Sequence, residues 1–311
     1  MLVTATRLLS LLLCLTALVA AGCGNRDGGS SGGGLDAHGS AGDPEAAATV
    51  TPTPTPTATP APVRGRFAVG DGRRLWLRCT GGGAPTVVYL HPYVETARDD
   101  GSEAAGRLPG LLGRTHRTCV YDRANVGHSS AVDGIQTGQD SVRDLHELLG
   151  NAGVDGPFIL LGSGFGGLLA DMYAATYPAE VAGMVMLDGD LPGDLDIQQR
   201  FLRASQQLQP GNWHGTVERL DRLETFRQAQ RLEGDEPEVP VTYIGPKDLR
   251  LDPSLPVTRV TAVIRDMQQT FLDRFDPGRL QLLDTPVPME PFVTDEIVAA
   301  VEQVSDDATG D

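Results

Sequence analysis

The chain has 311 residues, a formal net charge of −16 and a pI of about 4.7. This length accommodates a leader and one α/β domain, since such folds often run to about 250 residues. A chain this acidic repels the phosphates of nucleic acids and of lipid headgroups, so its overall charge argues against both as electrostatic partners.

The first 22 residues have the pattern of an export signal. Arg7 supplies a positive start, and the apolar stretch Leu8–Val19 is short for a membrane-spanning helix. The small residues Ala20-Ala21-Gly22 directly precede Cys23, which resembles a bacterial lipobox except that alanine replaces the usual leucine. We therefore expect an exported bacterial lipoprotein, anchored through a lipid on Cys23 to the extracytoplasmic face of the cell membrane. Ordinary cleavage of a secreted protein is the alternative.

Low-complexity sequence follows the signal. Residues 25–63 are rich in glycine and serine, then in alanine, and then in alternating Thr-Pro. Such a segment forms a flexible coil with a polyproline II portion and cannot build a core. The predicted organisation is an export signal at 1–22, a lipid-anchored linker at 23–63, a globular domain at 64–305 and a tail at 306–311.

The globular part alternates predicted strands and helices. Apolar runs of strand length predict strands at Gly72–Cys79, Thr86–Leu90, Thr118–Asp122, Phe158–Leu161, Ala182–Asp188, Val239–Gly245 and Leu280–Leu283. Helices are expected between them, among them Ser141–Leu149 with Ser141 as N-cap, and Asp295–Val304. Such alternation predicts an α/β fold with a doubly wound, mostly parallel sheet. The polar segment 189–238 interrupts the alternation and is expected to form a helical cap.

A glycine-rich turn follows the strand that starts at Phe158. Its letters fit a nucleophile elbow, in which a nucleophile stands between two small residues. In that register Gly162 and Gly166 are the small residues, and the nucleophile position is Gly164, which has no side chain. Making Ser163 the nucleophile would place larger residues at both small positions. The sequence therefore predicts an elbow without its nucleophile.

The same glycines also fit the dinucleotide-binding pattern Gly-x-Gly-x-x-Gly. Gly162, Gly164 and Gly167 satisfy it, and Asp188 follows at the distance of the acid that binds a ribose. However, two central strands precede the pattern, and exported proteins rarely meet free NAD. An NAD-type site is kept as an alternative, and no cofactor is expected otherwise.

Three stretches resemble the α/β-hydrolase family, over about residues 64–304. Tyr121–Ser129 is similar to the loop Tyr-Asp-Arg-x-Gly-x-Gly-x-Ser of that family, and His91-Pro92 matches its His-Gly segment with proline for glycine. The stretch Gly166–Asp188 follows the helix and strand after the elbow. The resemblance implies an α/β-hydrolase fold.

The catalytic residues of the family carry over poorly. The nucleophile falls on Gly164, the acid on Asp248 with Asp188 as second candidate, and the histidine near Val287. No histidine follows His214, so the base is missing as well as the nucleophile.

The resemblance also implies features outside the triad. The backbone N–H groups at Tyr93 and Phe165 would form the oxyanion hole, and His91 would lie at the pocket. Cys79 and Cys119 would lie on neighbouring strands, which predicts a disulfide. No metal-ligand spacing is present, so no metal site is expected.

The function that fits these residues is binding by a degenerate hydrolase. The expected partner is a small apolar or ester-like ligand in the former acyl pocket, or a protein at the cap. An active esterase-like hydrolase that uses Ser163 or a held water is the alternative.

Overall fold

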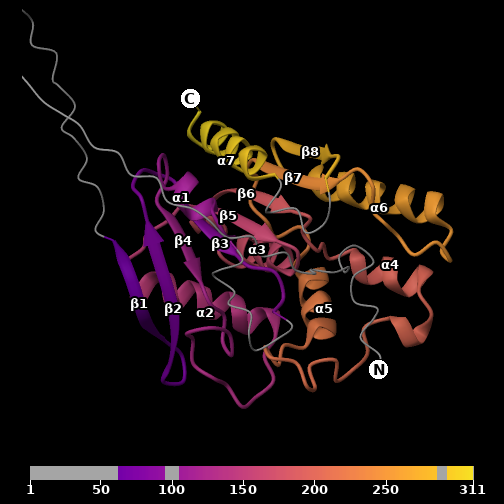
Figure 1. Cartoon of the computed structure of the whole chain (residues 1–311), viewed down its shortest axis with the longest axis horizontal. Coiled ribbons are helices and arrows are strands. Elements are labelled where there is room, and N and C mark those ends of the chain that lie inside the picture. The colour runs from indigo at the N-terminus through magenta and orange to yellow at the C-terminus, as the bar shows by residue number, and fades with distance from the viewer. Residues whose placement is uncertain (1–61, 95–104, 286–292, 311) are drawn as a thin grey trace, which may run out of the picture. The chain divides into compact units, whose positions relative to one another are not determined.

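A computed structural model of the chain describes residues 62–94, 105–285 and 293–310. The predicted signal and nearly all of the predicted linker, with Cys23, lie outside these ranges, as does Val287. The strands are β1 Val63–Val69, β2 Arg73–Thr80, β3 Thr86–Leu90, β4 Thr118–Tyr121, β5 Phe158–Ser163, β6 Val181–Leu187, β7 Val241–Pro246 and β8 Gly278–Leu283. They form one sheet in the order β1-β2-β4-β3-β5-β6-β7-β8 (Figure 1). β2 runs antiparallel to β1 and β4, and the other pairs are parallel. This confirms the predicted fold class, a mostly parallel sheet of α/β-hydrolase type.

Helices cover both faces of the sheet. The α-helices are α1 Leu108–Leu112, α2 Gly138–Asn151, α3 Phe165–Thr176, α4 Asp194–Phe201, α5 Arg222–Leu232, α6 Val257–Leu272 and α7 Thr294–Thr309. One apolar cluster packs α2, α3 and α5 against the sheet, and a second packs α1 and α7 against its other face. No helix in the described ranges is long and apolar enough to cross a membrane.

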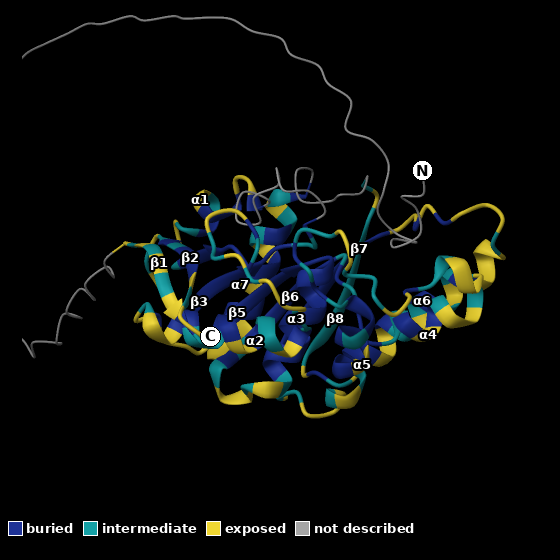
Figure 2. Cartoon of the chain, turned by 90° about the horizontal axis from the view of Figure 1, so that it is seen from below, coloured by how far each residue is buried: buried dark blue, intermediate teal, exposed yellow. Residues whose placement is uncertain are grey.

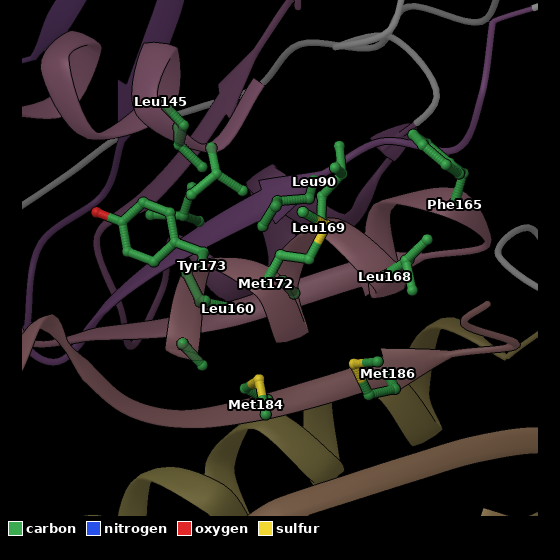
Figure 3. Packing of buried hydrophobic residues seen from close by; sticks show 14 of the residues in the cluster. Leu90, Leu145, Leu160, Phe165, Leu168, Leu169, Met172, Tyr173, Met184 and Met186 are labelled. Carbon is green, nitrogen blue, oxygen red and sulfur yellow. The ribbon is translucent and has the colours of Figure 1, made fainter. Parts of the chain in front are cut away.

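The central strands are buried on both sides. Every residue of β3 and β5 is buried, which is why these runs are apolar throughout instead of alternating (Figure 2). Figure 3 shows Leu160 of β5 beside Leu169, Met172 and Tyr173 of α3, and this packing supports the turn between that strand and that helix.

The second helix begins earlier than the sequence predicts. Thr137, not Ser141, is the N-cap: its side chain accepts from the Asp140 N–H, and the Asp140 side chain accepts from the Thr137 N–H. Ser141 and Asp144 have the same spacing as Thr137 and Asp140, so the sequence offers two similar candidates for the start of this helix. Asp144 instead accepts from both terminal guanidinium nitrogens of Arg73.

The two ends of the domain also differ from prediction. β1, which the sequence analysis did not predict, begins at Val63 and pairs along its whole length with β2 as an edge strand. α7 continues to Thr309 before Gly310 adopts the left-handed conformation that ends it. Residues 306–309 therefore belong to a helix, which corrects the predicted tail.

A disulfide joins two neighbouring strands. Cys79 of β2 and Cys119 of β4 lie directly opposite each other in the antiparallel pair, with their Cα atoms 4.0 Å apart. The predicted disulfide is confirmed.

Candidate functional site

The turn after β5 has the backbone of an elbow. β5 ends at Ser163, α3 starts at Phe165, and Gly164 between them has φ 49° and ψ −121°. This left-handed conformation favours glycine. The Gly164 N–H donates to the Leu187 carbonyl at 3.0 Å, and its carbonyl accepts from the Asp190 N–H at 2.8 Å. The turn is thus fastened to the end of β6.

Close backbone contacts explain the two flanking glycines. A Cβ atom on Gly162 would lie 2.6 Å from the Gly166 carbonyl oxygen, and one on Gly166 would collide with the Leu90 carbonyl. Neither position accepts a side chain without movement of backbone. The glycines at 162 and 166 are therefore required by the close packing of β3, β5 and α3.

Ser163 lies one residue before the turn and is only 3% exposed. Side chains alternate along a strand, and Ile159 and Leu161 belong to the apolar cluster under α1 and α7. Ser163 continues that row. Its hydroxyl therefore belongs to the α1 and α7 face of the sheet and not to the tip of the turn.

His91 is fully buried, and both of its ring nitrogens are engaged. Nδ1 lies 2.8 Å from the Pro92 carbonyl, and Nε2 lies 3.4 Å from the Arg123 amide nitrogen, whose N–H it accepts. These contacts assign the proton to Nδ1. Burial and the nearby Arg123 charge lower the pKa of His91 well below its usual value. The ring is neutral and has no free nitrogen to take a proton from a nucleophile.

The two acid candidates lie in different surroundings. Asp248 is exposed, and its Oδ1 accepts the Arg250 N–H at 3.0 Å, as in a surface turn. Asp188 directly follows β6, next to Leu187, which accepts from Gly164. The structure therefore places Asp188 next to the residue that holds the elbow, and Asp248 in an exposed turn after β7.

The two predicted oxyanion-hole residues meet through their rings. Phe165 and Tyr93 pack edge to face, with ring centroids 5.8 Å apart. Phe165 is the first residue of α3, so its N–H has no partner within the helix. An anion at this helix start would be favoured by that N–H and by the helix dipole.

Sequence reasoning missed a buried ion pair beside the elbow. Arg123 Nε donates to Glu218 Oε2 at 2.8 Å, and the two side chains are 3% and 1% exposed. Arg123 also donates to the carbonyls of His91 and Pro92 at 2.8 Å, and Glu218 accepts from the Val94 N–H at 2.5 Å. The pair fastens the predicted cap segment to the residues that follow β3.

Arg222, at the start of α5, was missed as well. Its guanidinium carbon lies 5.1 Å from the Tyr93 ring centroid and 5.8 Å from that of Phe165. One guanidinium nitrogen is 4.0 Å from Asp190 Oδ2. A buried cation therefore stands beside the two rings, and no local sequence signal distinguishes it from the exposed arginines around it.

A second carboxyl group, that of Asp194, lies close to Asp190. Asp194 of α4 is half-buried, and the desolvation of its carboxyl together with the charge of Asp190 raises its pKa to about 8. Its Oδ2 accepts the Leu191 N–H at 2.8 Å. No three His, Cys, Asp or Glu side chains in the described part of the chain are grouped so as to hold a metal ion.

These groups could hold an anionic or polarised head group but supply no reacting side chain at the turn. The glycine pattern also lies on the fifth strand of a sheet whose order differs from 3-2-1-4-5-6, the order of dinucleotide-binding folds. The fold therefore gives the NAD alternative no support.

Comparison with known proteins agrees with the fold. Residues 85–232 match the family model described as "alpha/beta hydrolase fold". An uncharacterized protein of Schizosaccharomyces pombe is 36% identical over 87 residues, which are 28% of this chain and 16% of that protein. An uncharacterized protein of Bacillus subtilis is 31% identical over 69 residues, 22% of this chain and 27% of that protein. The chain thus spans well under half the length of either relative.

Solved structures resemble the chain over a greater length. The crystal structure of Cfl2 from Burkholderia cenocepacia superposes with a TM-score of 0.56 at 16% identity, covering 79% of this chain and all of that one. A likeness at this identity establishes the fold alone.

Proposed function

We propose that this protein, which has an α/β-hydrolase fold and matches the model of that family over residues 85–232, binds a small ligand at the elbow without hydrolysing it. The observation that carries the proposal is Gly164 at the tip of the turn, where the family places its nucleophile. The engaged, neutral ring of His91 supports it, because a serine or water nucleophile needs a base within hydrogen-bond reach.

The surroundings of the elbow suggest the chemistry of the ligand. Arg222 and the N–H of Phe165 both favour a negative or strongly polar group, and the Tyr93 and Phe165 rings offer apolar area beside it. The ligand would be a small carboxylate or ester with an apolar body.

We place this binding protein outside the cell, held to the membrane by a lipid on Cys23. The support is the sequence alone: the apolar leader, the small residues before the cysteine and the Thr-Pro linker. Replacement of Cys23 by serine should release the protein into the medium or leave it unprocessed. Normal processing with undiminished membrane fractionation of the C23S protein would contradict the anchor.

Covalent labelling and binding together test the central proposal. The wild-type protein should not react with a fluorophosphonate probe or release p-nitrophenol from short esters. It should bind short-chain carboxylates in a thermal-shift or NMR titration, and Arg222→Gln should weaken that binding. Arg227→Gln, an exposed change on the same helix, is the matched control. Stoichiometric labelling of the wild type at Ser163 or any other serine would instead establish an active hydrolase.

A further inference from the structure

The acidic net charge conceals a strong asymmetry along the chain. Residues 62–123 hold ten arginines against six carboxylates, whereas residues 124–311 hold thirteen basic residues against thirty-one carboxylates. Charge asymmetry between segments indicates an interaction with a charged partner. The basic segment includes β1, β2 and α1, which lie together at one edge of the sheet (Figure 1).

A groove of about 530 Å³ lies in this basic part of the molecule. The residues that line it come from β2 and from around α1: Arg78, Thr80, Gly106, Arg107, Pro109, Gly110, Leu111 and Arg114. Arg107 and Arg114 are exposed, and Arg78 is half-buried. In the described ranges, none of these three arginines has a carboxylate within salt-bridge distance. The described lining of the groove therefore contains three arginines and no carboxylate.

A fourth arginine adds to the same face of the sheet. Arg64 of β1 is exposed and lies directly opposite Arg78 in the antiparallel pair. Like charges that face each other across two strands destabilise the pair, because side chains of opposed residues project to the same side. A bound anion between them would relieve this repulsion.

The point where the linker enters the domain indicates that the anionic groups near this groove are those of a lipid surface. Val63, the first residue of β1, lies opposite Cys79. Cys79 stands between Arg78 and Thr80, which both line the groove. The linker therefore joins the domain beside the groove. A linker anchored at Cys23 keeps the groove within reach of the lipid surface, so even weak binding there has a high effective concentration.

We propose that the groove formed by Arg78, Arg107 and Arg114, with Arg64 beside it, docks the domain on the phosphate groups of an anionic lipid surface. The choice of a lipid surface over a free phosphate compound rests on the proposed anchor at Cys23. Docking would hold the basic edge against the membrane, and the strongly acidic remainder of the chain would be repelled from it. The net charge of the whole chain argued against an anionic lipid surface because it sums the basic segment 62–123 with the acidic segment 124–311.

Vesicle sedimentation of the full chain carrying C23S tests the groove without any lipid anchor. This protein should bind vesicles of phosphatidylglycerol but not of phosphatidylcholine, and added salt should weaken the binding. Changing Arg107→Gln and Arg114→Gln together should lower the partition coefficient roughly 10- to 30-fold, the effect of losing two basic residues near an anionic surface. The matched control is Arg203→Gln with Arg259→Gln, two exposed arginines of the acidic part, which should bind as the parent does.

Three results would overturn the proposal. Equal losses in the test and control variants would mean that only net charge matters. Equal binding to both kinds of vesicle would exclude recognition of anionic lipid. Full displacement by inorganic phosphate, at matched ionic strength, would assign the groove to free phosphate compounds. None of these results depends on whether the elbow binds a ligand, so the two proposals fail separately.

Discussion

Removal of the charge on Glu218 should weaken the protein more than any surface substitution of the same kind. In Glu218→Gln the side chain keeps its size, but Arg123 stays buried without a counter-charge. Breaking a buried pair by removing one partner typically costs about 3–5 kcal/mol. Arg123 retains its two bonds to the carbonyls of His91 and Pro92, which partly offset its charge. We therefore expect the lower end of the range, about 3 kcal/mol.

Urea unfolding followed by circular dichroism measures this difference. Glu224→Gln is the matched control, because Glu224 also pairs with an arginine, Arg231 at 2.7 Å, but both side chains are more than a third exposed. Such a pair contributes about 0–1 kcal/mol. The double variant Arg123→Met with Glu218→Met should recover much of the lost stability, since it leaves no unpaired charge. If Glu218→Gln falls within about 1 kcal/mol of Glu224→Gln, the buried pair does not fasten the cap as inferred.

Three other predictions follow from the same structure. Burial and the charge of Asp190 raise the pKa of Asp194 to about 8. The folded protein therefore holds a proton on Asp194 that the unfolded chain releases near pH 4. As a result, the free energy of unfolding should fall as pH rises from about 4 to 8. Asp194→Asn should flatten this dependence, as urea titrations at several pH values would reveal. Replacing Cys79 and Cys119 by alanine opens a loop of 40 residues, and calorimetry should register a loss of about 4 kcal/mol. Gly164→Ser should fold with a loss of about 1–3 kcal/mol in the free energy of unfolding, because φ at that position is 49°. The variant should gain little esterase activity, because a serine nucleophile needs a base. A large gain in activity would reveal a base beside the turn.

The sequence was sufficient for the positions of the central strands along the chain because each of them carries its own signal. β3 and β5 are continuous apolar runs, and burial on both faces leaves no other pattern. The local sequence did not predict the start of α2 correctly, because two possible N-caps fit it equally well. Thr137 with Asp140 and Ser141 with Asp144 both fit a helix start; in the structure the first pair forms the cap and Asp144 binds the distant Arg73.

The candidate site was predictable only where its shape depends on the backbone. The glycines at 162, 164 and 166 mark the turn, since close contacts and a positive φ leave few alternatives. Arg123 and Glu218 are 95 residues apart, and Glu218 lies in a polar segment that looks exposed throughout. Their pairing follows from the path of the cap over the sheet, which no local pattern specifies.

The elbow backbone and the buried charges around it carry different information about function. The turn is held by packing and by hydrogen bonds to β6, so it would persist in a protein with or without catalytic activity. Arg222 is a different matter, because its buried guanidinium lies 5.1 Å from the Tyr93 ring centroid and 4.0 Å from Asp190 Oδ2. In the proposed function, this is the charge that would attract the polar head group of the ligand.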